Sequence, residues 1–237
     1  MGARRVLSWA VYGLPWLALQ TFYRSFYRLV RRRRHRHFVF RGQELEYFYH
    51  RYNFTWRNER IVEVPIAWSF VEAAGDRRVL EVGNVLSHYF PHRHTVLDKY
   101  DRAPGVINED ALTFAPGERY DVIVSISTLE HVGWDEDPRD PDKPVQVATN
   151  LARLLRPGGL LVASLPIGYN PHVDRSLGSR RFPFTETYCL KRVSRDNRWQ
   201  EVDWADIRDA RYGVPFPSAN GIVVGIVRCP PAVSGRA

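Results

Sequence analysis

The sequence predicts an α/β domain built around a doubly wound, mostly parallel sheet, and three observations lead to this prediction. Short apolar runs recur after residue 77, and their nearly continuous β-branched character is typical of strands buried on both faces. An acidic or small residue ends each run, and a segment of helical apolar spacing, 144–155, separates two of them. The 237 residues are 44% hydrophobic and 25% charged, which suits one globular domain with an extension.

Seven strands are expected. Five runs have the pattern of parallel strands: 78–83, 94–98, 106–110, 120–126 and 159–165. Two later runs, 198–204 and 221–227, predict an antiparallel pair at one edge of the sheet. A further helix is expected at 61–74, where Gly75 provides the stop.

The early crossovers are expected to be short. Fourteen residues, interrupted by Pro91, separate Gly83 from Asp98, which leaves room for about two helical turns. Seven residues separate Asp98 from Val106, whereas a parallel crossover usually takes a dozen or more. A loop therefore replaces the second crossover helix in this prediction.

Basic charge is concentrated at the N-terminus. Residues 1–60 hold 13 arginines and no lysine against three glutamates, while the remaining residues hold 21 basic and 23 acidic side chains. We therefore expect a basic, aromatic and helical extension at 1–60, a domain at 61–230 and a tail at 231–237. The near-neutral domain makes nucleic acid an improbable partner.

The first 41 residues predict contact with a membrane surface. The uncharged run 6–23 is short for a spanning helix and contains Gly13 and Pro15. In residues 22–31, apolar side chains and arginines fall on opposite helical faces, as in an interfacial helix on anionic lipid. We expect a cytoplasmic protein held peripherally at the cytoplasmic face. A spanning anchor, a leader that binds a partner and a helix packed on its own domain are the alternatives.

Candidate ligand-binding residues follow the first three expected strands. In open α/β sheets, ligands bind at the carboxyl ends of the strands, near the switch in strand order. Gly83 would let the backbone approach a ligand closely, and carboxylates at Asp98 and Asp110 would accept from ribose hydroxyls and from an exocyclic amine. The set predicts a nucleoside-containing cofactor.

Taken in order, these segments resemble the class I S-adenosylmethionine-dependent methyltransferases over roughly residues 61–228. The resemblance is carried by 79–83, 95–98, 108–111, 120–132 and 154–159. It implies a methyltransferase-type sheet, S-adenosylmethionine as cofactor and methyl transfer as activity. By this resemblance Asp98 holds the ribose and Asp110 lies at the adenine. The full implied cofactor site consists of Glu81, Gly83, Asn84, Asp98, Lys99, Asp110, Ala111 and Ser127.

One motif departs from the family pattern. The loop after the first strand carries one of the family's three glycines, and Val85, Leu86 and Ser87 occupy the rest of it. A degenerate fold that acts as a binding module is therefore one alternative. A nucleotide-cofactor oxidoreductase is another, although the loop lacks the Gly-x-Gly-x-x-Gly pattern that seats a pyrophosphate.

Two histidines are candidate catalytic residues. His131, after the fourth strand, is the best-placed imidazole for a general base, and His172, after the fifth strand and close to Tyr169, is the reserve. Glu130 and His131 would otherwise be only the start of a helix. The histidines at 88, 92 and 94 lack the spacing of metal ligands, so no metal site is expected.

The subtype is suggested by three stretches, 81–89, 126–135 and 165–171. They resemble a small group of bacterial methyltransferases associated with glycan or cell-envelope assembly. This resemblance implies a small-molecule or glycan acceptor that carries a hydroxyl or carboxyl group. The sequence indicates no oligomeric state.

Overall fold

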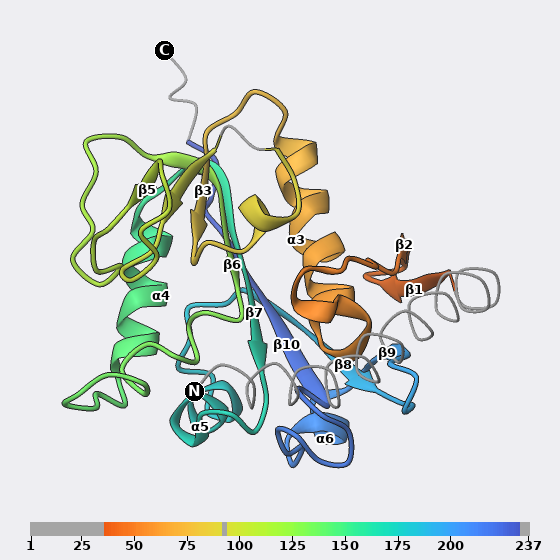
Figure 1. Ribbon diagram of the computed structural model, residues 1–237. Helices are drawn as coiled ribbons and strands as arrows, with labels where there is room; N and C mark the ends of the chain where they lie inside the picture. The colour runs from red at the N-terminus through yellow and green to blue at the C-terminus, as the bar shows by residue number, and fades with distance from the viewer. Residues whose placement is uncertain (1–35, 92–93, 233–237) are drawn as a thin grey trace, which may run out of the picture. The chain divides into compact units, whose positions relative to one another are not determined.

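The computed structural model describes residues 36–91 and 94–232 of two compact units, Met1–His37 and Phe38–Ala237. The second unit is built on an eight-stranded sheet of order β5-β4-β3-β6-β7-β10-β8-β9 (Figure 1). The predicted interfacial helix at 22–31 and most of the predicted extension lie outside the described residues. Within the described ranges, no helix is both long and apolar enough to cross a membrane.

The strands of the sheet are β3 (Val79–Val82), β4 (Thr95–Leu97), β5 (Val106–Ile107), β6 (Tyr120–Ile126), β7 (Leu155–Pro166), β8 (Glu186–Arg192), β9 (Trp199–Val202) and β10 (Gly221–Arg228). The helices are α3 (Arg60–Ala74), α4 (Lys143–Arg153), α5 (Pro171–Gly178) and α6 (Trp204–Ile207), with 3-10 turns η2 (Tyr52–Arg57) and η3 (Leu86–His88). Strands β1 (His37–Phe40) and β2 (Gln43–Glu46) form a separate small sheet.

The sheet has a parallel half and an antiparallel half. Strands β5, β4, β3, β6 and β7 pair in parallel, and the chain reverses its direction of winding between β3 and β6. This is the doubly wound arrangement that the sequence predicts. Strand β10 pairs antiparallel with both β7 and β8, and β8 pairs antiparallel with β9.

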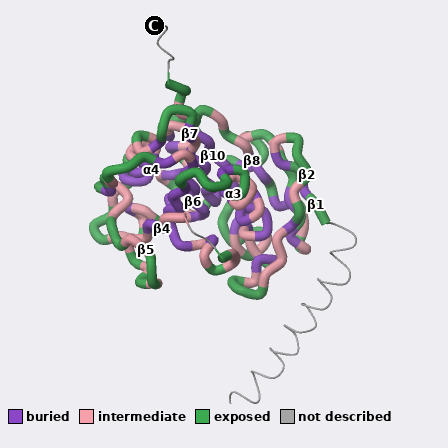
Figure 2. Tube along the Cα trace, turned by 90° about the horizontal axis from the view of Figure 1, so that it is seen from above, coloured by how far each residue is buried: buried purple, intermediate pink, exposed green. Residues whose placement is uncertain are grey.

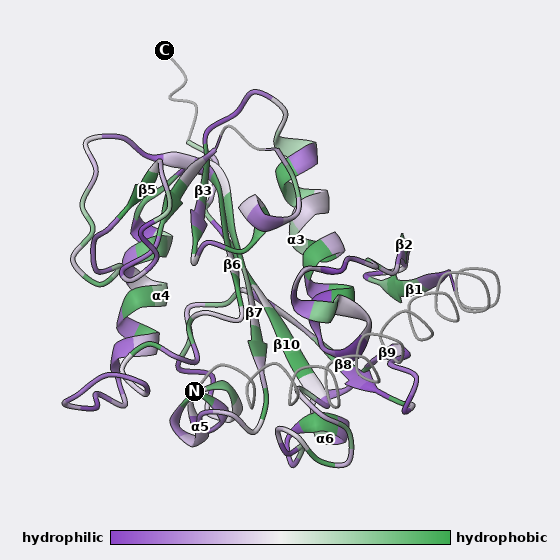
Figure 3. Ribbon diagram, in the orientation of Figure 1, coloured by the Kyte–Doolittle hydropathy of each residue, from purple (hydrophilic) through white to green (hydrophobic). Residues whose placement is uncertain are grey.

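The strand count and one pairing correct the sequence prediction. The sheet has eight strands and not seven, because β8 was not predicted from its mixed polar and apolar sequence. Strand β8 lies between β9 and β10, so these two are not the neighbouring edge pair that was expected. The strands in the middle of the sheet, β6, β7 and β10, are nevertheless mainly hydrophobic (Figure 3).

Helices α3 and α4 cover opposite faces of the sheet (Figure 1). On β6, Val122 and Val124 belong to the same core as α3, whereas Ile123 packs in the core that contains Leu151 of α4. This alternation follows from the two-residue period of a strand. Figure 2 shows the buried residues concentrated in the strands between the two helices.

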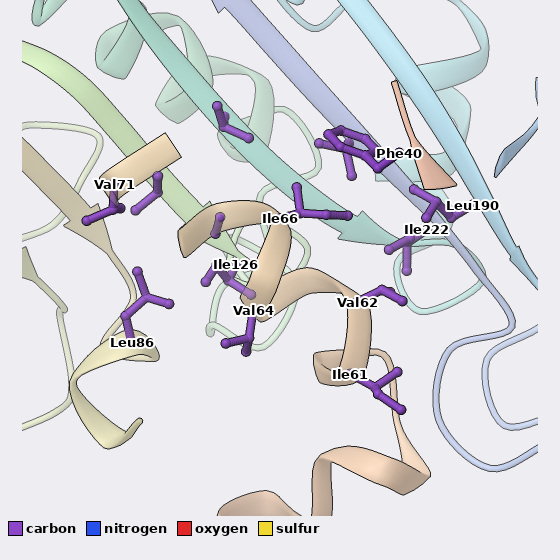
Figure 4. Close-up of a cluster of buried hydrophobic side chains, with 14 of the residues drawn as sticks. Phe40, Ile61, Val62, Val64, Ile66, Val71, Leu86, Ile126, Leu190 and Ile222 are labelled. Carbon is purple, nitrogen blue, oxygen red and sulfur yellow. The ribbon is translucent and has the colours of Figure 1, made fainter. Parts of the chain in front are cut away.

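Helix α3 is buried on nearly all sides because the segment before it also packs on it. Figure 4 shows Ile66 among side chains that include Phe40 of β1 and Ile222 of β10. Pro65 lacks the N–H group that would bond to the carbonyl of Ile61. The backbone amide of Phe48 donates to that carbonyl instead, at 2.9 Å.

Residues 38–60 therefore belong to the compact unit. Phe38, Phe40 and Tyr47 are buried in its core, and the Tyr47 hydroxyl bonds to both backbone groups of Trp199 in β9. The boundary predicted at residue 61 falls inside this unit, which begins at Phe38. The segment is too rich in polar residues between its aromatic anchors for its packing to be evident from the sequence.

The two early crossovers are as short as the spacing predicted, or shorter. The chain between β3 and β4 forms only the three-residue turn η3, instead of the two helical turns expected. The chain between β4 and β5 is a loop, which confirms the predicted absence of the second crossover helix.

We expect Tyr47→Phe to lower the free energy of unfolding by about 1–3 kcal/mol, because the buried amide of Trp199 loses its hydroxyl acceptor. Urea denaturation of the full chain measures the change. Tyr52→Phe, at an exposed side chain, is the matched control. An unchanged midpoint for Tyr47→Phe would show that the hydrogen bonds between Tyr47 and Trp199 do not stabilise the domain.

Candidate cofactor and active site

A cavity of about 510 Å³ lies at the carboxyl ends of β3, β4 and β6. Its volume is within the usual range for small-molecule sites. Seven of the eight residues predicted to bind the cofactor line it: Gly83, Asn84, Asp98, Lys99, Asp110, Ala111 and Ser127. The predicted site is therefore brought together in one place, at the switch point of the sheet.

The loop after β3 passes close to the loop after β6 at Gly83. This glycine has a φ of 85°, and a Cβ at its position would lie 2.1 Å from Oγ1 of Thr128. A side chain is thus excluded by both backbone conformation and space. The family pattern has three glycines in this loop. The one that this chain keeps, Gly83, stands where the backbone requires a glycine.

Glu81 holds the loop after β3 in place through hydrogen bonds and is not among the residues that line the cavity. Its side chain is fully buried, and Oε1 accepts hydrogen bonds from the amides of Val85 and Leu86 at 2.7 and 2.6 Å. Oε2 lies 2.8 Å from Nε2 of His94. The carboxylate therefore supports the cofactor loop, and a direct contact between Glu81 and a cofactor stays a prediction.

Asp98 joins the end of β4 to the loop after β3. Its Oδ1 accepts from the amides of Tyr100 and Asp101, at 2.8 and 2.9 Å, and its Oδ2 accepts from the amide of Asn84 at 3.1 Å. Each carboxylate oxygen can accept more than one hydrogen bond. Oδ2 therefore keeps acceptor capacity on the side of the cavity.

Asp110 is the centre of a charged network in the wall of the cavity. Its Oδ2 accepts from Nζ of Lys99 at 2.9 Å and from Nζ of Lys143 at 2.7 Å, while Glu136 lies 2.5 Å from Lys143. Burial alone would raise the pKa of Asp110, but the hydrogen bond from Lys143 and further bonds lower it to about 2. Asp110 is thus held ionised and fixed in position.

His131 lies at the rim of the cavity with an acidic partner. Its Nδ1 is 2.6 Å from Oδ2 of Asp135, which also accepts from the hydroxyl of Tyr169 at 2.7 Å. The His131 and Tyr169 rings meet edge to face, with centroids 4.6 Å apart. A histidine oriented in this way by a carboxylate can take up a proton from a bound group.

His172, the reserve candidate, lies elsewhere. It is at the start of α5 and is absent from the described residues that line the cavity. Its ring is 5.7 Å from that of Trp134. The geometry therefore favours His131, although the catalytic role of either histidine stays a prediction.

Three residues near the cavity were not predicted from the sequence: Asp135, Glu136 and Lys143. Lys143 follows Asp142 at the start of α4, where it reaches across to Asp110. One feature of the sequence could have indicated it, because lysine is rare here: Lys99 and Lys143 are two of the chain's three lysines. Nothing in the sequence indicates Asp135 or Glu136 in the same way, because neither residue directly follows an expected strand.

Part of the chain is similar to a known protein family. Residues 86–163 match a family described as a methyltransferase domain. No curated protein matches the chain.

Several solved structures are similar at low sequence identity. N-methyltransferase NodS from Bradyrhizobium japonicum WM9, solved with S-adenosyl-L-homocysteine, is 17% identical with a TM-score of 0.44, over 70% of this chain and 84% of that one. A methyltransferase from Thermotoga maritima is 13% identical, with a TM-score of 0.42 over 70% and 90%. One from Clostridium acetobutylicum is 9% identical, with a TM-score of 0.38 over 69% and 90%.

The family match begins inside the loop after β3, beyond Gly83, and it covers Asp98, Asp110 and the loop that carries His131. Residues 86–163 thus match a methyltransferase domain, and the strand order around them is the doubly wound one. S-adenosylmethionine is its cofactor, and the domain supports methyltransferase activity.

Proposed function

We propose that the protein transfers the methyl group of S-adenosylmethionine, bound in the cavity, to a nucleophilic group held beside His131. The observation that carries this proposal is the presence of Gly83, Asp98 and the His131–Asp135 pair around one cavity at the switch point. When bound, the cofactor supplies an electrophilic methyl group on a sulfonium sulfur.

The residues of the cavity suit this cofactor. The close approach at Gly83, where a Cβ would clash, lets the backbone pack against the ligand. Asp98 has acceptor capacity for ribose hydroxyls, and Ala111 next to Asp110 offers an apolar contact for a base. The cofactor needs no phosphate-binding glycine loop, which accords with the short loop after β3.

His131 serves as the general base in this proposal. Asp135 fixes the orientation of the imidazole through Nδ1, and Tyr169 in turn holds Asp135. A small-molecule or glycan acceptor, as the sequence suggests, would lie between His131 and the loop after β7. We further propose that the leader, residues 1–41, holds the protein peripherally at the cytoplasmic face of a membrane.

The cofactor site predicts binding of S-adenosylhomocysteine to the full chain, measured by calorimetry. Asp98→Asn removes the charge that the ribose hydroxyls would meet, so affinity should fall by roughly 10–150-fold. Asp76→Asn, at an exposed residue after α3, is the control and should bind normally. A wild-type protein that binds neither S-adenosylhomocysteine nor S-adenosylmethionine would rule out the proposed function.

The active-site proposal predicts that His131→Ala lowers kcat by about 10²–10⁴ with little change in cofactor affinity. Label transfer from S-adenosylmethionine into fractionated cell extract measures turnover, and calorimetry measures affinity. Wild-type turnover in His131→Ala would assign the proton transfer to another group, and His172→Ala is then the next variant to assay.

The leader predicts association with anionic vesicles. Replacing Arg31, Arg32, Arg33 and Arg34 by Gln removes four charges, each of which contributes about 1 kcal/mol near such a surface. Flotation at low salt should then recover far less of this variant than of the wild type with phosphatidylserine vesicles, and little of either with neutral vesicles.

The matched control replaces four exposed arginines of the compact unit by Gln: Arg153, Arg175, Arg195 and Arg208. It loses the same charge and should still float. If the wild type stays in the soluble fraction with anionic vesicles, the proposed membrane attachment is wrong.

A further inference from the structure

Three glutamates and one arginine are buried together behind the loop that carries His131. Glu59 and Glu63 lie at the start of α3, and Glu130 follows β6. Glu63 accepts from Arg60 at 2.9 Å through Oε2 and from the Ser127 hydroxyl at 2.6 Å through Oε1. Among the residues that the structure describes, Glu63 is the member of this group that forms an ion pair with Arg60.

Glu130 is the member of this group whose hydrogen bonding is incomplete. The residue is 1% exposed, and its Oε2 is a buried atom without a hydrogen-bond partner. Burial, together with the nearby charges of Glu63 and Glu59, raises the pKa of Glu130 well above the usual range. A buried polar atom without a partner is unfavourable, so a donor that reached Oε2 would stabilise the protein.

The cluster adjoins the cavity through two residues. Ser127 bonds to Glu63 and also lines the cavity. His131 lines it as well, and its Nε2 lies 3.7 Å from Oε1 of Glu130. Tyr212, which contacts Tyr169 with ring centroids 5.3 Å apart, lies within hydrogen-bond distance of Glu59. Glu63 and Glu130 therefore each lie next to a residue that lines the cavity.

We propose that Glu130, supported by Glu59 and Glu63, recognises the methyl acceptor as a cation, so that the acceptor group is an amine that binds in its ammonium form. This inference rests on the proposed function and specifies its substrate class. The ammonium supplies the donor that Oε2 lacks and the positive charge that three carboxyl groups around one arginine lack.

Glu130 and His131 can carry the proton that methyl transfer to an amine releases. The charge of the bound ammonium favours the ionised form of Glu130, and the ammonium nitrogen then passes one proton to a Glu130 oxygen and gains a free lone pair. That lone pair forms the new N–C bond, while the C–S bond of S-adenosylmethionine breaks and its electron pair stays on sulfur. Glu130 relays the proton to Nε2 of His131, which stays the final base of the proposed function; its side chain is 46% exposed and can release the proton to solvent.

Other acceptor groups fit the cluster less well. A carboxylate acceptor would bring a further acidic group to three buried carboxyl groups, and its desolvation would be unfavourable. A hydroxyl group could donate to Oε2 but would leave the missing positive charge unsupplied. The amine thus differs from the hydroxyl or carboxyl acceptor that the sequence suggested.

The test titrates three small probes into the full-length protein saturated with S-adenosylhomocysteine: propylammonium, 1-propanol and propionate. Saturation is confirmed first by calorimetry, so a failure to bind S-adenosylhomocysteine is counted against the proposed function and not against the choice of acceptor. We expect propylammonium to bind at least tenfold more tightly than either of the other probes.

Glu130→Gln keeps the size of the side chain and removes its charge. It should weaken propylammonium binding by roughly 10–150-fold without changing the affinity for S-adenosylhomocysteine. Glu72→Gln, at an exposed position near the other end of α3, is the matched control. Equal binding of 1-propanol and propylammonium by the wild type, or unchanged propylammonium binding by a folded Glu130→Gln, would overturn the proposal.

A second measurement does not depend on a variant. Cell extract is labelled with methyl-labelled S-adenosylmethionine before and after its amines are acetylated with acetic anhydride. Label uptake that acetylation abolishes and that mild base does not release supports an amine acceptor. Uptake that survives acetylation, or label that base releases as methanol from an ester, contradicts it.

Discussion

The buried carboxylate of Glu81 is the interaction on which the cofactor site depends. Glycine-rich loops reach a ligand because their backbone is permissive, yet this loop has a single glycine after β3. Glu81 compensates by accepting two backbone amides, those of Val85 and Leu86, and thereby fixes the turn from within. The loop is ordered by hydrogen bonds to one side chain, so the residues that follow Gly83 need no special backbone conformation.

The parallel half of the sheet was predictable because each of its strands is an apolar run ended by a distinctive residue. The antiparallel half was less so. Strand β8 has only a short apolar centre between polar ends, and its place between β9 and β10 is set by long-range pairing that no local pattern encodes. The same reasoning applies to β1, whose Phe38 and Phe40 are buried only because α3 and the far strands meet them.

The candidate site was predictable to the extent that the topology defines it. Gly83, Asp98 and Asp110 follow consecutive strands, so a parallel sheet must place them on one edge. The partners of these residues come from positions that strand order does not specify. Lys143 reaches Asp110 from a helix, and Asp135 reaches His131 from the next turn of the same loop. The burial of Glu130 is likewise a property of the packing of α3, which its sequence neighbours do not reveal.

The scarcity of lysine gives the network around Asp110 a practical consequence. Among 34 basic residues only Lys99, Lys143 and Lys191 carry a primary amine on the side chain. Two of these amines meet at one carboxylate in the wall of the cofactor cavity. Reagents that acylate amines, which on most proteins label the whole surface, would on this chain report on very few positions. Mass spectrometry of such labelling would compare Lys99, whose amine is ion-paired in the cavity wall, with Lys191 on β8 as an internal reference.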